Sequence, residues 1–330
     1  MNNTLCPHPF VNIHIKPSGD IRPCCSWSGQ SFGNINTDQI EDVWNNDSFK
    51  ELRSKMINDE WHDGCFRCKI KEDNNLASMR QTALRVHTNY DINETLSVKF
   101  DEWDIRNTNL CNLKCQTCGP KCSSLHNGSE TKVTSNQIYE IVDNNIKTVK
   151  KVYFAGGEPL INDFHYYIID KLIENSRSDC ILMYSTNLTK LNYKNQNIID
   201  KWKFFDTVKV YGSIDSLGTK NDLLRTNSKW DTLETNLNRL IDEKVDVEIS
   251  TCVSKLNVGD IPKIYFYLKE KGIRGNFNNV LTNPLIFSFN AMTSRERRNA
   301  LNNLAKYIDN KDTEIANICK KFTKMLTLPE

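Results

Sequence analysis

The sequence predicts an α/β fold preceded by a small cysteine-rich domain, and three observations lead to that prediction. From about residue 99, apolar runs of strand length alternate with longer amphipathic stretches. Six such alternations indicate a parallel sheet with helical crossovers, either an open doubly wound sheet or a barrel. Before residue 80, proline and glycine interrupt the chain often, and five of the twelve cysteines lie there.

The predicted elements of the larger domain follow one another in a regular order. Strands are expected at 103–106, 151–154, 181–185, 207–211, 245–251 and 274–278. Helices are expected at 135–147, 163–175, 195–204, 232–243 and 261–271. In both alternative architectures, ligands bind at the carboxyl ends of the strands, so the loops that follow strands are the places to look for functional residues.

The first 80 residues are expected to form short strands and turns with one helix-like stretch at 40–56. Apolar residues are too few there for a free-standing core. A bound metal cluster would supply the missing folding free energy. A polar segment at 89–95 has the composition of a linker.

Composition limits the classes of function. The chain is 38% hydrophobic and 25% charged, with a formal net charge of +2. This balance gives no bias toward nucleic acid or an anionic membrane. The first residues have no basic or apolar leader and no run reaches the ~18 apolar residues of a membrane span, so we expect a cytoplasmic protein. In a reducing compartment, twelve cysteines indicate metal binding more than disulfides. The scattered Cys180, Cys252 and Cys319 are expected to be small buried residues.

A run of three cysteines, Cys111-Asn-Leu-Lys-Cys115-Gln-Thr-Cys118, follows the first predicted strand of the larger domain. Three thiolates are one short of a tetrahedral zinc site or a fully ligated four-iron cluster. A four-iron cluster held by three cysteines leaves one iron open to bind a small molecule through nitrogen and oxygen. Cys122 offers an alternative, because four thiolates could hold zinc or an electron-transfer cluster.

The spacing Cys-x3-Cys-x2-Cys after a first strand resembles the signature of the radical S-adenosylmethionine (SAM) enzymes. The resemblance implies that the open iron binds the amino and carboxylate groups of SAM. It further implies that an external donor such as flavodoxin or ferredoxin reduces the cluster, and that SAM is then cleaved to a 5′-deoxyadenosyl radical. That radical abstracts hydrogen from a substrate. The family commonly has an aromatic residue before the third cysteine, whereas this chain has Thr117.

Later strand ends also resemble the family, in the same order, and imply SAM-binding residues. The family's GGEP motif is matched by Gly156, Gly157, Glu158 and Pro159, its polar third strand end by Ser185 and Asn187, its Ser-x-Asp element by Ser213 and Asp215, and its carboxylate-binding arginine by Arg225. Turn formation, helix capping and a solvated arginine are the structural alternatives. The resemblance implies a partial (β/α)6 TIM-type barrel with the cluster and SAM near its top.

The N-terminal cysteines resemble the opening of SPASM and twitch auxiliary-cluster domains. Cys6 is followed by twelve residues, Gly19, four residues and Cys24, and the pair Cys65-x2-Cys68 comes later. The resemblance implies one auxiliary [4Fe-4S] cluster on these four thiolates, with Cys25 as the alternative. Structural zinc is the other possibility, and His8 or His62 could replace a thiolate. SPASM domains usually follow the barrel, but here the segment comes first.

These patterns give expectations for domains and function. We expect an auxiliary-cluster domain at 1–88, a linker at 89–98, a radical SAM partial barrel at 99–290 and a C-terminal helical segment at 291–330. The expected function is a radical SAM enzyme acting on a peptide or protein side chain, or alternatively on a small molecule such as a sugar or nucleotide precursor. A non-catalytic zinc or iron–sulfur protein that binds a partner is the alternative of another class. The basic segment 79–86 is expected to be a solvated helix.

Overall fold

A computed structural model describes residues 4–74 and 76–327. The chain has a mixed α/β fold with a large, mostly parallel sheet. Two compact units are distinguished by their internal contacts. The first unit comprises Met1–Asn109, Glu130–Met183 and Lys203–Thr207, and the second comprises Leu110–Ser129, Tyr184–Trp202 and Val208–Glu330.

In the first unit, the sheet has the order β7-β6-β4-β1-β2-β3. Its strands are β1 (Asn12–Ile15), β2 (Asp20–Arg22), β3 (Gly33–Asn34), β4 (Glu102–Ile105), β6 (Lys151–Phe154) and the first residues of β7 (Ile181–Thr186). Strand β1 pairs in parallel with β4, so that His14 lies opposite Asp104. The pairings of β1 with β2 and of β2 with β3 are antiparallel. The cysteine-rich segment therefore extends the main sheet, a pairing that the sequence did not predict.

The helix expected at 40–56 is two helices, so that prediction was wrong. Helix α2 covers Ile40–Trp44 and helix α3 covers Asp47–Ile57. The chain breaks at Asn46, which has extended backbone angles and whose side chain accepts a hydrogen bond from the Phe49 N–H. An asparagine in that position is a favoured helix N-cap, and here the cap outweighs continuation of the helix.

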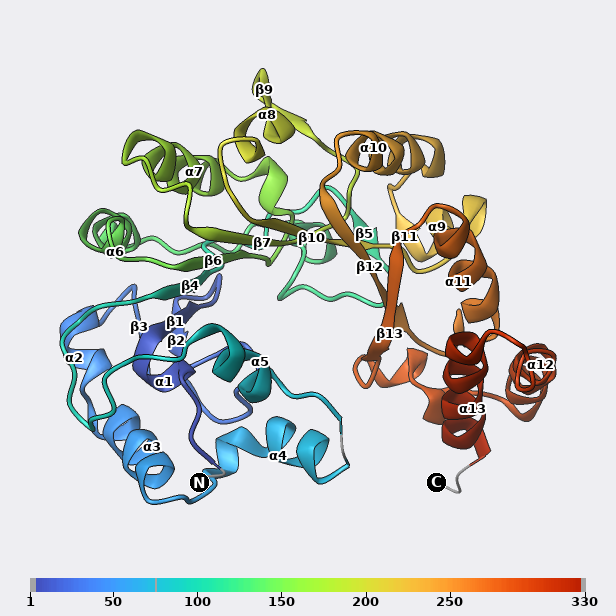
Figure 1. Cartoon of the computed structure of the whole chain (residues 1–330), viewed down its shortest axis with the longest axis horizontal. Helices are drawn as coiled ribbons and strands as arrows, with labels where there is room; N and C mark the ends of the chain where they lie inside the picture. The colour runs from blue at the N-terminus through green and yellow to red at the C-terminus, as the bar shows by residue number, and fades with distance from the viewer. Residues whose placement is uncertain (1–3, 75, 328–330) are drawn as a thin grey trace. The chain divides into compact units, whose positions relative to one another are not determined.

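The remaining helices of the first unit are visible in Figure 1. They are α1 (His8–Val11), α4 (Phe66–Asp73), α5 (Met79–Val86), α6 (Gln137–Asn145) and α7 (Asp163–Glu174). Helix α5 begins with a capping box in which Ser78 and Gln81 satisfy each other's backbone N–H groups. Large side chains such as Trp44, Phe49 and Trp103 are fully buried and supply much of the core of this unit.

In the second unit, the sheet has the order β13-β12-β10-β7, and β10, β12 and β13 pair in parallel. The three strands are β10 (Val208–Ser213), β12 (Asp246–Val253) and β13 (Arg274–Val280). Two short antiparallel pairs accompany them: β5 (Lys114–Cys115) with β11 (Arg225–Thr226), and β8 (Asn192–Tyr193) with β9 (Gln196–Asn197). Along β12 the side chains alternate between buried and more exposed, as the two-residue period of a strand requires.

The helices of the second unit follow its strands (Figure 1). They are α8 (Ile198–Trp202), α9 (Gly218–Leu224), α10 (Trp230–Asp242), α11 (Ile261–Glu270), α12 (Ser294–Ala305) and α13 (Thr313–Thr327). Helices α12 and α13 pack against each other. Their apolar faces bury Leu304, Ile315 and Phe322 completely.

The fold class predicted from the sequence is confirmed, and each of the six predicted strands overlaps an observed one. The five predicted helices of the larger domain likewise overlap α6, α7, α8, α10 and α11. The short helices α1 and α9 were not predicted. The domain boundaries at 88, 98 and 290 stay a prediction. Within the described residues, no helix is both long and apolar enough to cross a membrane.

Candidate functional site

The three cysteines of the run lie in the segment 110–129 of the second unit. The Leu113 N–H donates a hydrogen bond to the Cys111 sulfur over 3.4 Å. Cys115 is buried in β5, whereas Cys111 and Cys118 are partly exposed. This arrangement fixes the loop by its backbone and leaves two of the three thiols accessible.

Arg225 lies opposite Cys115 in the antiparallel pairing of β11 with β5. Its Nη1 donates to Asp215 Oδ2 over 2.9 Å, and both side chains are almost entirely buried. Burial disfavours the charged guanidinium, but Cys115 and Asp215 outweigh that cost and hold the pKa of Arg225 above its usual range. Among the described residues, its Nε has no hydrogen-bond partner. A buried, permanently charged cation with a free donor beside the cysteine loop fits an anionic ligand.

The Asp215 carboxylate is fully engaged within the protein. The second carboxylate oxygen accepts a hydrogen bond from the Cys252 N–H over 2.9 Å. The backbone N–H of Asp215 donates to Asn221 Oδ1 over 3.1 Å. Both carboxylate oxygens of Asp215 therefore have partners within the protein. Asn221, completely buried, was missed by sequence reasoning because it lies in an unpredicted helix.

The prediction that all three scattered cysteines are buried was wrong for Cys252. Cys180 and Cys319 are buried, but Cys252 is partly exposed near the end of β12. Its thiol is hydrogen-bonded to the side chain of Thr117, the residue that precedes Cys118. Burial and the Asp215 carboxylate raise the pKa of Cys252 to about 11. Side chains on a strand point alternately to the two faces of the sheet, so a cysteine on β12 can face either the core or the opposite side. The position of Cys252 in the sequence did not distinguish the two.

A cluster of amide and hydroxyl groups holds the loop just after Cys111. Asn187 Nδ2 donates to Asn112 Oδ1 over 2.9 Å, and Asn112 Nδ2 donates to Thr189 Oγ1 over 2.8 Å. Asn187 Oδ1 accepts from the Thr189 hydroxyl over 2.6 Å. Asn187 was predicted as a site residue, whereas Asn112 and Thr189 were missed. The signal available for Asn112 was its place between the first two cysteines of the run.

Cys122 lies beside Cys118 and is exposed. Their thiols are hydrogen-bonded, and this contact together with burial raises the pKa of Cys118 above its usual range. Cys122 is therefore close enough to Cys118 to stay an alternative fourth thiol of this site.

Two further predicted residues lie at strand ends of the second unit. Ser185 is half-buried in the last part of β7. Ser213 is the last residue of β10, where it lies opposite Ser250 of β12. Both serines are at the carboxyl ends of parallel strands, where ligands bind in sheets of this class.

The Gly156-Gly157-Glu158-Pro159 turn follows β6 in the first unit. Gly156 has a φ of +88°, and a Cβ atom there would lie 3.0 Å from the Cβ of Arg106. Only glycine meets both conditions without strain. Glu158 is buried, and its side chain accepts a hydrogen bond from the Leu160 N–H over 3.1 Å, which caps the short helix Pro159–Ile161.

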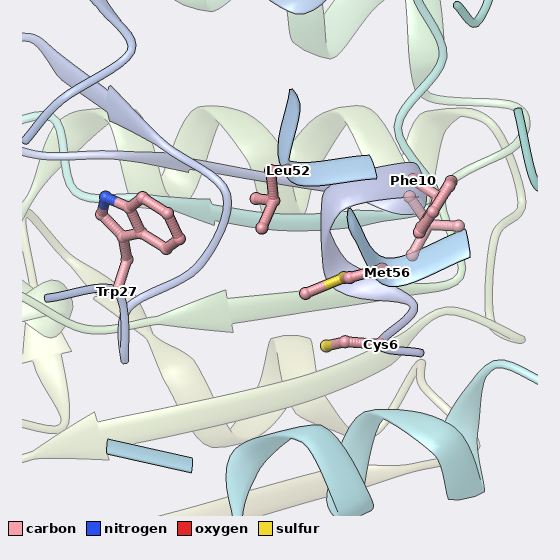
Figure 2. Close-up of a cluster of buried hydrophobic side chains, with 6 residues drawn as sticks. Cys6, Phe10, Trp27, Leu52 and Met56 are labelled. Atoms are coloured by element: carbon pink, nitrogen blue, oxygen red, sulfur yellow. The ribbon is translucent and has the colours of Figure 1, made fainter. Parts of the chain in front are cut away.

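The four N-terminal cysteines Cys6, Cys24, Cys65 and Cys68 line one pocket of the first unit. About 390 Å³ of space lies between its atoms, part of it open to solvent. Apolar side chains form much of its wall, and Figure 2 shows the ends of Cys6 and Met56 extending toward the side on which Trp27 lies.

Glycine is required at the entrance to the Cys65 turn. Trp27 packs so closely on Gly64 that an added Cβ would lie 2.2 Å from its ring, and Ser28 donates two hydrogen bonds to the Gly64 carbonyl. Cys65 and Cys68 are thus held against the wall of the pocket by local packing.

The pocket favours bound metal over free thiolates. Burial raises the pKa of Cys65 to about 12, and Cys68 nearby adds to the effect. Burial likewise holds the pKa of Cys6 and Cys24 above the usual range. Ionised thiols here need the positive charge of metal ions to be stable. The residues therefore fit a cluster.

Within residues 4–74 and 76–327, no three His, Cys, Asp or Glu side chains converge as ligands of a single metal ion. In a cluster each thiolate binds a different iron, so the thiols stand farther apart than four ligands of one zinc ion.

The alternative ligands differ in their surroundings. Cys25 is not among the described residues that line the pocket, and burial with the Asp104 carboxylate raises its pKa to about 12. His8 lines the pocket, and its Nε2 lies 3.6 Å from Glu102. His62 Nδ1 accepts a hydrogen bond from the Gly64 N–H over 2.9 Å.

Comparison with known families matches both parts of the chain. Residues 105–275 match the model of the radical SAM superfamily, which is more than half of the chain. The chain belongs to the radical SAM superfamily. Residues 6–69 match the SPASM model, described as an iron–sulfur cluster-binding domain. Membership implies a [4Fe-4S] cluster that binds SAM, and the SPASM match implies an auxiliary iron–sulfur cluster. Radical SAM proteins are enzymes, so the non-catalytic alternative is set aside.

Curated relatives of this radical SAM chain cover part of it. An uncharacterised protein of Methanocaldococcus jannaschii is 32% identical over 51% of this chain and 58% of its own length. A GTP 3′,8-cyclase of Pasteurella multocida is 26% identical over 52% of this chain and 50% of its own length. The chain therefore spans about half the length of the curated relatives that it matches.

Solved structures of low sequence identity match parts of this chain. The structure of native anSMEcpe with bound AdoMet and the Kp18Cys peptide has a TM-score of 0.45 at 20% identity, covering 63% of this chain and 59% of that one. Streptococcus suis SuiB bound to S-adenosylmethionine has a TM-score of 0.44 at 14% identity, covering 93% of this chain and 71% of SuiB.

Proposed function

We propose that this chain is a SAM-cleaving radical enzyme in which Cys111, Cys115 and Cys118 hold the cluster. One observation carries the proposal: a buried arginine, Arg225, lies opposite Cys115 and is held by Asp215. When bound and reduced, the cluster supplies the electron that cleaves SAM so that hydrogen can be abstracted from a substrate. A small acidic or iron–sulfur electron carrier, flavodoxin or ferredoxin, is the proposed external donor.

The proposed roles of the protein groups follow from their chemistry. Arg225 pairs with the SAM carboxylate through its free Nε donor, and Asp215 keeps the guanidinium in place. The turn at 156–159 offers backbone groups for the SAM amino group, because its glycines allow close approach. Ser185 and Ser213 supply hydroxyl groups at strand ends, and Asn187 supports the cysteine loop.

The proposed auxiliary cluster is held by Cys6, Cys24, Cys65 and Cys68. The pocket that these residues line supports this ligand set, because its apolar wall limits water around a cluster. Cys25 has a different environment and is proposed as a spare thiol.

For the substrate, we propose a peptide or protein side chain, because auxiliary-cluster domains of this kind resemble those of peptide-modifying radical SAM enzymes. The second candidate is a nucleotide or similar small molecule. The GTP 3′,8-cyclases among the curated relatives favour this second candidate.

Anaerobic purification with iron and sulfide analysis tests the cofactor assignment. About eight irons per chain are expected from two four-iron clusters. Incubation with SAM and dithionite should release 5′-deoxyadenosine from the parent chain. Cys111→Ala should abolish this product, whereas the matched variant Cys122→Ala, in the same loop, should retain it. Retention of the product in Cys111→Ala, or its loss in Cys122→Ala, contradicts the three-cysteine site.

Isotope transfer tests the substrate class. Deuterium from labelled peptides or nucleotides is followed into 5′-deoxyadenosine by mass spectrometry. Transfer from a peptide pool supports the first candidate, and transfer from nucleotides alone replaces it with the second.

A further inference from the structure

Arg80 is a buried cation in the wall of the four-cysteine pocket. It lies in the first turn of α5, is 9% exposed, and lines the pocket together with Cys6, Cys24, Cys65 and Cys68. The SPASM match ends at residue 69, so Arg80 lies beyond the residues matched to that family. Its position in the pocket is a feature of this chain that the family match does not assign.

The guanidinium connects the segments that carry the cysteines. Nη1 donates to the carbonyl of Leu5, the residue before Cys6, over 3.1 Å. Nε donates to Glu72 Oε1 over 3.0 Å, and Nη2 is paired with the other carboxylate oxygen. Glu72 belongs to α4, the helix that carries Cys68. The guanidinium also lies over the ring of Trp61, 5.4 Å from its centroid.

The partner of Arg80 is itself fixed. Ser78, the N-cap of α5, donates from its hydroxyl to Glu72 Oε1 over 2.5 Å. The neighbouring charges on α4 are arranged differently, because Lys69 pairs with Asp73 over 2.8 Å on the exposed face. Arg80 therefore lines the pocket while its charge is paired with a carboxylate of α4, and the geometry of this pair is held from both helices.

We propose that Arg80 is a positioning residue that sets the reduction potential of the auxiliary cluster and stabilises its binding. The inference rests on the proposed function, in which the four cysteines hold that cluster. A cluster with four thiolates is anionic and gains a further negative charge when it is reduced. A fixed cation in a low-dielectric wall favours the reduced form and raises the potential, and Glu72 reduces that effect.

The test uses the full chain carrying Cys111→Ala, Cys115→Ala and Cys118→Ala, so that only the auxiliary cluster gives a signal. Its midpoint potential is measured by a redox titration followed by electron paramagnetic resonance, with iron analysis on every sample. In Arg80→Gln, the ratio of reduced to oxidised cluster at a given potential should fall at least tenfold, equivalent to 59 mV for one electron. Arg80→Lys should have a potential close to that of the parent, because lysine keeps the positive charge.

Arg85→Gln is the matched control, because Arg85 lies on the same helix but is exposed. Its potential should equal that of the parent. A parent potential in Arg80→Gln with full iron content overturns the inference. So does an equal shift in Arg80→Lys and Arg80→Gln, since that would make the effect structural.

Glu72→Gln keeps the proposal testable if Arg80→Gln loses its iron. Removing the carboxylate leaves Arg80 unopposed, so the potential should rise, and an unchanged or lowered potential overturns the inference. Absence of iron from the triple-alanine parent has a different meaning, because it overturns the auxiliary cluster of the proposed function and the inference with it. Iron present with an unmoved potential overturns the inference alone.

Discussion

Arg225 donates to the Asp215 carboxylate over 2.9 Å, and the two side chains form a buried ion pair in the second unit. The second oxygen of the same carboxylate accepts from the backbone of Cys252. Asp215 thereby links the arginine of β11 to the end of β12. The pair can keep a cation ready for an anionic ligand without leaving either charge unpaired.

Asp215→Asn should raise the dissociation constant of SAM about tenfold or more. The substitution replaces the charge-assisted hydrogen bond that holds Arg225 by a neutral one, which contributes only about 1 kcal/mol. The dissociation constant is measured by equilibrium dialysis with the iron-loaded protein. Asp242→Asn, exposed at the end of α10, is the control and should bind SAM as the parent does. Unchanged affinity at full iron content in Asp215→Asn would show that the pair does not support the ligand.

Asn112→Ala should lower the amount of iron bound at the cysteine run. The substitution removes the partner of Asn187 and Thr189, and an unsatisfied buried amide costs about 1–3 kcal/mol. Iron is counted in a chain that also carries Cys65→Ala, so that the auxiliary site contributes little. Asn127→Ala, in the same segment, serves as the comparison. Equal iron in both variants would argue against a supporting role for Asn112.

Gly156→Ala should destabilise the first unit by roughly 1–3 kcal/mol, because an alanine at a φ of +88° is strained and its methyl group meets Arg106. Thermal unfolding of the cofactor-loaded chain measures the effect. Gly119→Ala is the control, since an added Cβ there meets no described atom within 4 Å. A melting temperature that falls equally in both variants would contradict the steric explanation.

Cys65→Ala should reduce the iron content from about eight to about four per chain, whereas Cys25→Ala should keep both clusters. Both cysteines belong to the first unit, and of these two described residues Cys65 lines the pocket whereas Cys25 does not. Iron analysis and limited proteolysis are the measurements, and α4 should become sensitive to protease in Cys65→Ala. Loss of four irons in Cys25→Ala would replace the proposed ligand set with one that includes Cys25.

Glu102→Gln should destabilise the chain by roughly 3–5 kcal/mol at pH 7, because it leaves buried partners of a charge cluster uncompensated. Burial alone would raise the pKa of Glu102, but His8, His87 and Lys151 outweigh it and hold that pKa well below 4.5. A folded pKa below the unfolded value stabilises the protein above pH 4.5, and the contribution is lost as the pH falls further.

Urea unfolding at pH 7 compares Glu102→Gln with Glu94→Gln, whose side chain is exposed. The second variant should unfold as the parent does. Equal urea midpoints for Glu102→Gln and the parent would show that the charge cluster around Glu102 does not stabilise the fold.

The sequence was informative where structure is local and less so where partners are distant in the chain. Strand β6 was predicted with its observed bounds, since its apolar run is bordered by polar residues and a Gly-Gly turn. The pairing of β1 with β4 was missed, because the four residues of β1 show no period that identifies a partner 90 positions away.

The candidate site shows the same division. The cysteine spacing and the strand-end motifs led to the proposed site residues, which stay a prediction. Asn112, Thr189 and the partial exposure of Cys252 depend on contacts that only the folded chain creates. Arg80 is a further case. Its place in the wall of the pocket follows from the packing of α5 and α4, and its sequence neighbourhood indicated only a solvated helix.

The parallel pairing of β1 with β4 also constrains how the protein is made. Asn12 to Ile15 find their partners at 102–105, so a nascent chain must extend past residue 105 before the N-terminal sheet can close. Until then, the edge of β1 that β4 will cover has no strand to protect it. A chain shortened to its cysteine-rich part would therefore emerge from the ribosome with an open sheet edge.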